Sequence, residues 1–231
     1  MSADIALQNE IFAARRLHAS LTFRTGAPDG IAVIDRVGTV VTLKHDEALF
    51  REGDPADRYF KVVRGAVRGC KLLADGRRHI GDFFLPGDFI GLDAAETYGF
   101  SAEAVSDITI IRYARRKVEA LAWQEPRVAK SLVKMMREDL CAARERMTLL
   151  GHLTAMERIA SFLLTMADRT GDTRVSLPMT RTDIGDYLGL TMETVSRAFS
   201  RLKGDGVIEQ KSVHEVVIVD RDALEELAEV A

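Results

Sequence analysis

Apolar residues between positions 180 and 206 recur with the period of an α-helix in two short blocks. The first block contains three apolar residues: Tyr187 and Leu188 follow Ile184 by three and four positions. Thr180 and Asp183 have the spacing of a capping box, which begins a helix. Gly189 follows the block, and helices often end in a residue that tolerates a positive φ. The pattern predicts a short helix and then a tight turn.

The second block predicts a helix with one buried and one polar face. Thr191 can cap this helix. Its apolar stripe consists of Val195, Phe199 and Leu202, and its opposite face carries Glu193, Thr194, Ser196, Arg197, Ser200 and Arg201. Two helices joined in this way are typical of a helix-turn-helix, whose second helix enters the major groove of DNA. The alternative is an ordinary helical hairpin with a solvated polar face.

Three residues on the polar face have side chains that can read bases. Arg can pair with guanine through two hydrogen bonds, Glu can accept one from cytosine, and Ser can reach donor or acceptor edges. Glu193, Ser196 and Arg197 lie on one face of the predicted helix within its first two turns. We therefore expect these three side chains to contact bases.

Between positions 33 and 113 the chain consists of short apolar runs separated by turns. Four glycines recur at intervals of 12, 11 and 11 residues: Gly53, Gly65, Gly76 and Gly87. Strands are expected over 59–63, 67–73 and 79–85. Evenly spaced short strands favour an antiparallel sandwich or barrel of the double-stranded roll type.

The longest helical pattern begins at Pro126 and ends before Gly151. Small or apolar residues alternate along it at spacings of four and three, as in a coiled-coil seam: Ala129, Val133, Met136, Leu140, Ala143, Met147 and Leu150. Leu132 and Met135 lie on a neighbouring face. We expect that face on the roll and the seam against a second copy, in a parallel homodimer. The alternative is a helix packed wholly on its own domain.

The remaining segments complete an α+β chain. Helices are expected over 115–124 and 153–168, with some helical character over 11–21 that ends at the breaker GAPDG, residues 26–30. A small strand is expected over 175–178, and residues 207–209 and 216–219 suit a hairpin wing.

Three units follow from these elements. Residues 1–124 are expected to form a sensor-like β-roll with flanking helices, and 125–150 a dimerisation helix. Residues 151–231 are expected to form a winged helix-turn-helix domain.

At 231 residues the chain is long enough for two domains, each with its own core. A hydrophobic fraction of 47% is typical of a compact protein. The chain lacks an apolar run of about 18 residues, and its start lacks the basic and apolar regions of a secretory signal. We therefore expect a cytoplasmic protein. Cys70 and Cys141 do not make a disulfide framework, and both are expected to be small buried hydrophobes.

Charge does not by itself indicate a partner. The net charge is −3, and from residue 151 onward there are 9 Lys and Arg against 14 Asp and Glu. Much of that acid follows Asp220, where it can face away from DNA. Any basic footprint is local, so charge neither supports nor opposes DNA binding.

The segment LPMTRTDIGDYLGLTMETVSR resembles the family of the catabolite activator protein and FNR, and the resemblance covers nearly the whole chain. Its Glu-x-x-Ser-Arg helix is similar to that of the FNR branch, whereas Met192 stands where the other branch has a further arginine. The resemblance implies that Glu193, Ser196 and Arg197 read an inverted repeat of the TTGAT/ATCAA type. It also implies that four residues contact phosphates of the DNA backbone: Thr180, Arg181, Thr191 and Thr194.

The roll departs from the cyclic-nucleotide-binding members of that family. It keeps GDFIG, residues 87–91, but Leu92 replaces the acidic residue that meets the ribose, and Phe100 replaces the arginine that neutralises the phosphate. An apolar side chain cannot compensate a buried anion, so cyclic AMP is not expected as a ligand. The segment before Cys70 has no cysteine, whereas an iron–sulfur cluster needs about four thiolates. No cofactor or metal is expected.

What remains resembles the FixK-like class, FNR-type regulators without the cluster. The resemblance implies a homodimeric transcription regulator, an activator that contacts double-stranded DNA and RNA polymerase and controls low-oxygen or nitrogen-oxide respiration genes. Two alternatives stay open: a haem-dependent nitric-oxide sensor of the same family, and a ligand-binding roll without specific DNA binding. The sequence shows no nucleophile, base and orienting group in a recognisable pattern, so an enzyme is not expected.

Overall fold

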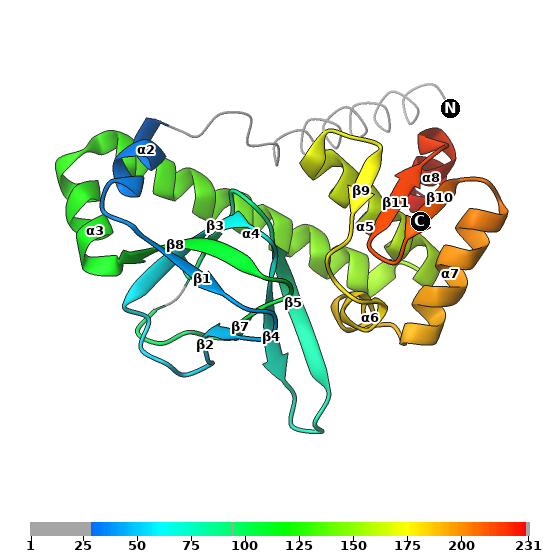
Figure 1. Cartoon of the computed structure of the whole chain (residues 1–231), viewed down its shortest axis with the longest axis horizontal. Helices are drawn as coiled ribbons and strands as arrows, with labels where there is room; N and C mark the ends of the chain where they lie inside the picture. Colours follow the sequence, from blue (N-terminus) through cyan, green and yellow to red (C-terminus); the bar gives the residue numbers. More distant parts are fainter. Residues whose placement is uncertain (1–28, 94, 230–231) are drawn as a thin grey trace, which may run out of the picture.

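The computed structural model describes residues 29–93 and 95–229 as a β-roll, a long helix and a C-terminal domain (Figure 1). The long helix α4 runs along the roll and leads into the C-terminal domain. The helical character expected over 11–21 lies outside the described residues. Among the residues described, no helix is long and apolar enough to cross a membrane.

Two four-stranded antiparallel sheets form the roll. One has the order β1-β8-β3-β6 and the other β2-β7-β4-β5. The strands are β1 Thr39–Leu43, β2 Ala48–Phe50, β3 Arg58–Arg64, β4 Val67–Leu72, β5 Arg78–Phe84, β6 Phe89–Ile90, β7 Ser101–Ala104 and β8 Ile108–Ala114. The three strands expected from the sequence correspond to β3, β4 and β5 with small shifts of their ends.

The regularly spaced glycines mark the turns of the roll. Gly53, Gly65, Gly76 and Gly87 all have φ between 83° and 99°, a region that favours glycine. Gly65 is also sterically required, since a Cβ there would lie 2.7 Å from the carbonyl oxygen of Asp107. The spacing therefore reflects the repeated reversal of the chain.

Apolar side chains fill the roll between its sheets and at one end. Phe60, Val62 and Ile110 of one sheet pack with Val67 and Ala102 of the other. At the end, helices α2 Asp29–Asp35 and α3 Arg115–Gln124 form a second cluster with α4. The sequence had suggested a chain break, not a helix, where α2 begins. The helix forms because its apolar residues have a surface to cover.

Helix α4 spans Pro126–His152, two residues beyond its expected end. Met135 is buried and Leu132 is partly buried in the apolar cluster at the end of the roll, as expected. Four large apolar residues of the predicted seam lie outside that cluster and are 49–75% exposed: Val133, Met136, Leu140 and Met147. The predicted seam is thus a separate apolar stripe on the outside of the single chain.

The C-terminal domain is a winged helix-turn-helix, as predicted. Its elements are α5 Ala155–Thr170, β9 Arg174–Ser176, α6 Arg181–Leu188, α7 Met192–Gly204, β10 Ile208–Ser212, β11 Glu215–Ile218 and α8 Arg221–Glu229. The strands form one sheet of order β10-β11-β9.

Helix α5 begins two residues later than expected, because Thr154 and Glu157 form a capping box that the apolar pattern alone did not reveal. Helix α8 packs on α5 and was also not anticipated, because its acidic residues obscure a short apolar face.

Roll and C-terminal domain share one continuous apolar core. Ile80 and Phe83 of β5 belong to the same buried cluster as Ile159 and Phe162 of α5 and Ile184 of α6. The two domains are therefore packed against each other and not merely linked by α4.

Candidate nucleic-acid interface

Helix α6 is held at its start by a reciprocal pair of side chains. The Thr180 hydroxyl accepts a hydrogen bond from the Asp183 backbone N–H at 3.1 Å, and Asp183 Oδ2 accepts one from the Thr180 backbone N–H at 3.0 Å. Asp183 Oδ2 also accepts the Thr180 hydroxyl proton at 2.7 Å. The capping box predicted from the sequence is confirmed.

A tight turn connects α6 to α7. Gly189 ends α6 in the left-handed region with φ of 67°, as expected. Gly185, one turn earlier, lies against the turn so closely that a Cβ would be 2.6 Å from the carbonyl oxygen of Leu190. The Leu190 backbone N–H also donates to the Gly185 carbonyl oxygen at 2.9 Å, so the turn that leads into α7 is held against α6.

Helix α7 presents a polar face on a buried apolar one. Val195, Phe199 and Leu202 are at most 2% exposed, and Thr191 caps the helix through the backbone N–H of Thr194 at 3.2 Å. The exposed residues on the other side include Glu193, Ser196, Arg197, Ser200 and Arg201. The helix lies on the side of the C-terminal domain away from the roll (Figure 1). All three expected base-reading residues are therefore accessible together.

Hydrogen bonds within α7 organise this polar face. The hydroxyls of Thr191 and Thr194 are 3.1 Å apart, and Thr194 Oγ1 accepts a bond from Arg197 Nη2 at 3.4 Å. The backbone N–H of Glu193 and the Thr191 hydroxyl lower the pKa of the Glu193 carboxyl. At neutral pH this face therefore offers an ionised acceptor and a guanidinium donor side by side.

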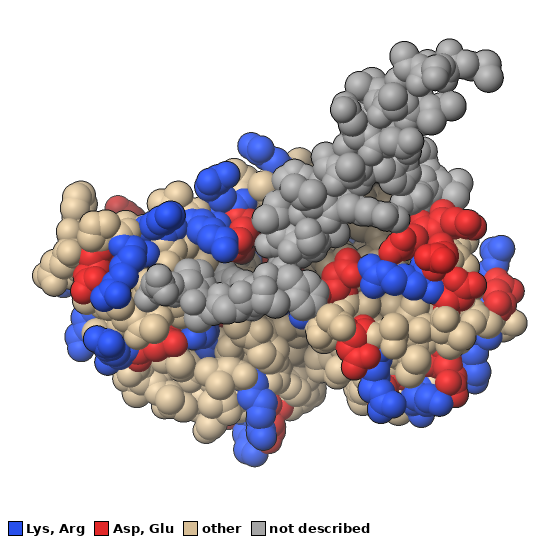
Figure 2. Space-filling model, turned by 90° about the horizontal axis from the view of Figure 1, so that it is seen from above, with Lys and Arg blue, Asp and Glu red and all other residues tan. Residues whose placement is uncertain are grey.

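Charge on the C-terminal domain is mixed. On the face shown in Figure 2, acidic and basic side chains alternate over this domain. The sequence count of 14 acids against 9 bases from residue 151 onward agrees with this view. Recognition would therefore depend on the particular side chains of α7 more than on a general basic surface.

Family models match both halves of the chain. Residues 40–124 match the cyclic nucleotide-binding domain, and residues 157–227 match the Crp-like helix-turn-helix domain. The FixK nitrogen fixation regulation protein of Azorhizobium caulinodans is 42% identical over 201 residues, which are 84% of this chain and 81% of that protein. The chain belongs to the Crp/FNR family.

Further relatives place this regulator near the FixK type. FnrL, a transcriptional activator protein of Cereibacter sphaeroides, is 34% identical over 82% of this chain and 80% of its own length. The solved structure of FixK2 from Bradyrhizobium japonicum superposes with a TM-score of 0.80 and 42% identity, covering 84% of this chain and 99% of that one. A Crp-family regulator from Thermus thermophilus, TTHB099, has a TM-score of 0.65 and 27% identity over 81% of this chain and 96% of its own. The protein is a DNA-binding transcription regulator of the FixK/FNR type.

Arg181 lies in a different place from that expected of a phosphate ligand. Its guanidinium carbon is 3.4 Å from the centroid of the Phe199 ring, and both terminal nitrogens are buried without a hydrogen-bond partner among the residues described. Burial lowers the pKa of Arg181 to about 10. The predicted phosphate contact therefore requires the side chain to rotate off Phe199.

Phe100 packs inside the roll of this Crp/FNR protein. Its ring lies 5.6 Å from that of Phe50 and 6.1 Å from that of Phe84, between centroids. Leu92 packs on the apolar cluster at the end of the roll. Neither side chain carries a charge that could pair with an anionic ligand.

The two cysteines differ in their surroundings. Cys70 is buried in β4, as expected, and burial raises the pKa of its thiol. The expectation that Cys141 is also buried is wrong for the single chain, where it is exposed on α4. Its neighbour Leu140 is also exposed, because none of the elements that the structure describes packs on that face of α4.

Proposed function

We propose that this FixK/FNR-type regulator activates transcription as a homodimer bound to an inverted repeat of the TTGAT/ATCAA type. The observation that carries this proposal is the exposed face of α7, where Glu193, Ser196 and Arg197 lie together above a buried apolar stripe. In each half-site Arg197 pairs with a guanine and Glu193 accepts from a cytosine. Thr180, Thr191 and Thr194 hold the backbone, and Arg181 joins them after rotating.

The dimer forms through the outer stripe of α4. Four large side chains there are about half or more exposed in the single chain, which is unusual for a contiguous stripe on a 27-residue helix. A helix of this length runs about 40 Å, long enough for several heptads of contact. In a two-fold dimer the two α7 helices face one side of the duplex about one helical turn apart.

Similarity to named relatives supports the physiological part of the proposal. FixK of Azorhizobium caulinodans is named for nitrogen fixation regulation, and FnrL and the anr protein of Pseudomonas aeruginosa are named transcriptional activators. We infer control of low-oxygen or nitrogen-oxide respiration genes through RNA polymerase, without cyclic AMP or an iron–sulfur cluster. A protein that acts on chromosomal DNA in this way works in the cytoplasm.

A titration of the full-length protein against operators altered one base pair at a time tests the proposal. Arg197→Ala should lose about 1–3 kcal/mol of discrimination in each half-site and relax the preference for the paired guanine. Arg201→Ala is the matched control, since Arg201 is exposed on the same helix one turn further on. It should weaken all operators about equally. A uniform loss for Arg197→Ala, with base preference intact, would contradict the assignment of α7 as the reader.

A further inference from the structure

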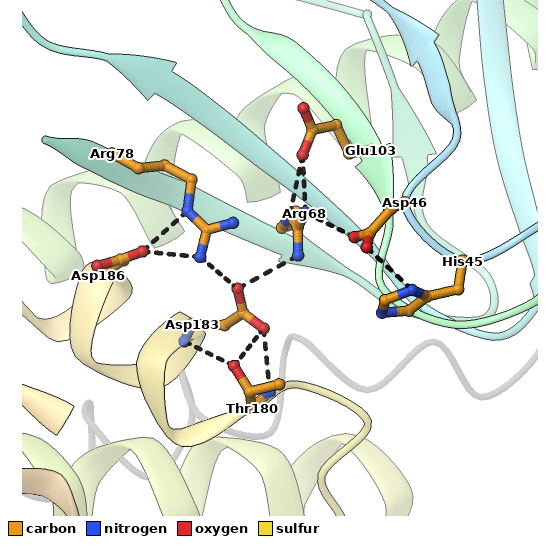
Figure 3. A network of polar contacts seen from close by, with 8 residues as sticks. All are labelled: His45, Asp46, Arg68, Arg78, Glu103, Thr180, Asp183 and Asp186. Carbon is orange, nitrogen blue, oxygen red and sulfur yellow. Dashed lines mark hydrogen bonds and ion pairs between the residues drawn. The ribbon is translucent and has the colours of Figure 1, made fainter. Parts of the chain in front are cut away.

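A network of ion pairs joins the roll to the first helix of the helix-turn-helix (Figure 3). Arg68 of β4 and Arg78 of β5 both reach Asp183 of α6. Arg78 Nη2 lies 2.6 Å and Arg68 Nη1 3.3 Å from Asp183 Oδ1. Arg78 also pairs with Asp186, the next turn of α6, at 2.8 Å. Two roll strands thus contact two successive turns of one helix.

The two oxygens of Asp183 serve different partners. Oδ2 accepts two hydrogen bonds from Thr180 and completes the capping box. Oδ1 accepts hydrogen bonds from the guanidinium groups of Arg68 and Arg78 in the roll. The side chain is 3% exposed, so these partners satisfy it away from water. One buried carboxylate therefore starts α6 and also fixes that start against the roll.

Arg68 is itself held in place by the roll. Its side chain is 10% exposed and donates to Glu103 of β7 at 2.9 and 3.0 Å and to Asp46 at 3.0 Å. A guanidinium with this many fixed acceptors has little freedom to follow α6 if the helix moves. Displacing α6 would leave buried charges without partners, which is costly.

A second point of attachment lies at the other end of α6. The Tyr187 hydroxyl accepts a bond from Arg146 of α4 at 3.1 Å, and its ring lies 5.2 Å from that of Phe83 of β5, between centroids. Arg146 also pairs with Asp82 of β5 at 3.1 Å. Two separated contacts restrain rotation as well as translation, so α6 has a defined orientation relative to the roll and α4.

We propose that Arg68 and Arg78 are positioning residues for DNA recognition. They hold α6, and through the Gly185–Leu190 contact also α7, at the angle to α4 at which the two recognition helices of a dimer match their half-site spacing. Because the network uses the inner side of α6, the reading face of α7 stays exposed in the held conformation. This inference rests on the proposed dimer and inverted repeat.

The test compares substitutions of neighbouring arginines on one hairpin. Met is close to Arg in length and covers apolar surface without charge, so Arg68→Met and Arg78→Met remove the ion pairs with little loss of packing. Arg77→Met is the control, because Arg77 is 77% exposed and pairs with Asp75 of the same turn. Operator affinity is measured by fluorescence anisotropy for the full-length dimer on duplexes whose central spacer is native or altered by one or two base pairs.

Arg68→Met and Arg78→Met should each lower affinity for the native spacer roughly 5- to 150-fold, the usual range of coupling between sites. They should also flatten the preference for that spacer, a change that a general loss of stability would not produce. Arg77→Met should match the wild type. An equal loss on all spacers, an unchanged affinity or a tighter binding would each overturn the inference, the last by showing that the network holds α7 away from DNA.

A conservative pair of variants provides a second measurement if the methionine variants fold poorly. Arg78→Lys keeps a positive charge beside Asp183 and should keep part of the spacer preference, whereas Arg78→Gln should lose it. Equal loss of spacer preference in both variants, or none in either, in folded dimers would overturn the inference. The proposed function and this inference are refuted by different results. A wild-type protein without base preference would refute operator reading. Base-specific binding that does not change when Arg68 or Arg78 is substituted would refute only their positioning role.

Discussion

Leu140→Asp should break the dimer, and the structure allows the size of the effect to be worked out. Leu140 is 52% exposed in the single chain, so the seam would bury about half of its side chain, worth about 1 kcal/mol in each copy. Two carboxylates facing each other at about 6 Å add about 3 kcal/mol of repulsion at an effective dielectric constant of about 20. The total of about 5 kcal/mol weakens dimerisation by three to four orders of magnitude.

Light scattering across a dilution series measures this directly, together with operator titration of the same samples. The variant should scatter as a monomer at concentrations where the wild type is a dimer, and its operator affinity should fall because the half-sites are no longer bound together. Leu72→Asp is the matched control, since Leu72 is also an exposed leucine, at the end of β4. A Leu140→Asp protein that remains a dimer with full operator affinity would refute the seam.

Three further outcomes follow from individual residues. Calorimetry with cyclic AMP should give no heat of specific binding, because Phe100 offers the phosphate no charge; saturable heat coupled to tighter operator binding would contradict this. Arg181→Met should keep or raise the midpoint of thermal unfolding, since it removes a buried guanidinium without a hydrogen-bond partner among the described residues. It should also lower operator affinity with a smaller salt slope, because the proposed phosphate contact is lost, and an unchanged salt slope would contradict that contact. Thr154→Ala should cost about 1 kcal/mol of stability by removing the α5 cap, whereas Thr165→Ala, within the same helix, should cost much less, and equal losses would contradict the capping argument.

Local features of the fold followed from the sequence because they depend on residues close together in the chain. The capping box of Thr180 and Asp183 links residues three apart, and the left-handed end of α6 depends on Gly189 alone. The turns of the roll were marked by glycines for the same reason. The buried apolar stripe of α7 and the exposed apolar stripe of α4 both follow from helical periodicity.

The sequence did not anticipate the contacts of side chains that have a choice of partners. Arg181 has the chemistry of a phosphate ligand, yet it stacks on Phe199 of the neighbouring helix, a contact that no local pattern indicates. Cys141 was expected inside because cysteine is commonly buried, but in the part of the chain that the structure describes it is exposed on α4.

The sequence by itself determined the helices, turns and capping residues of the DNA-reading unit, because hydrogen bonds within a turn of helix depend on residues three or four apart. It also determined which faces are apolar, and it supplied the side chains that are candidates for reading bases. Only the tertiary structure decided that Asp183 Oδ1 accepts hydrogen bonds from Arg68 and Arg78 of the roll. These two residues lie 115 and 105 positions away along the chain. The physical reason is that a buried carboxylate needs partners, and which guanidiniums supply them is settled by how the two domains dock and not by their order in the chain.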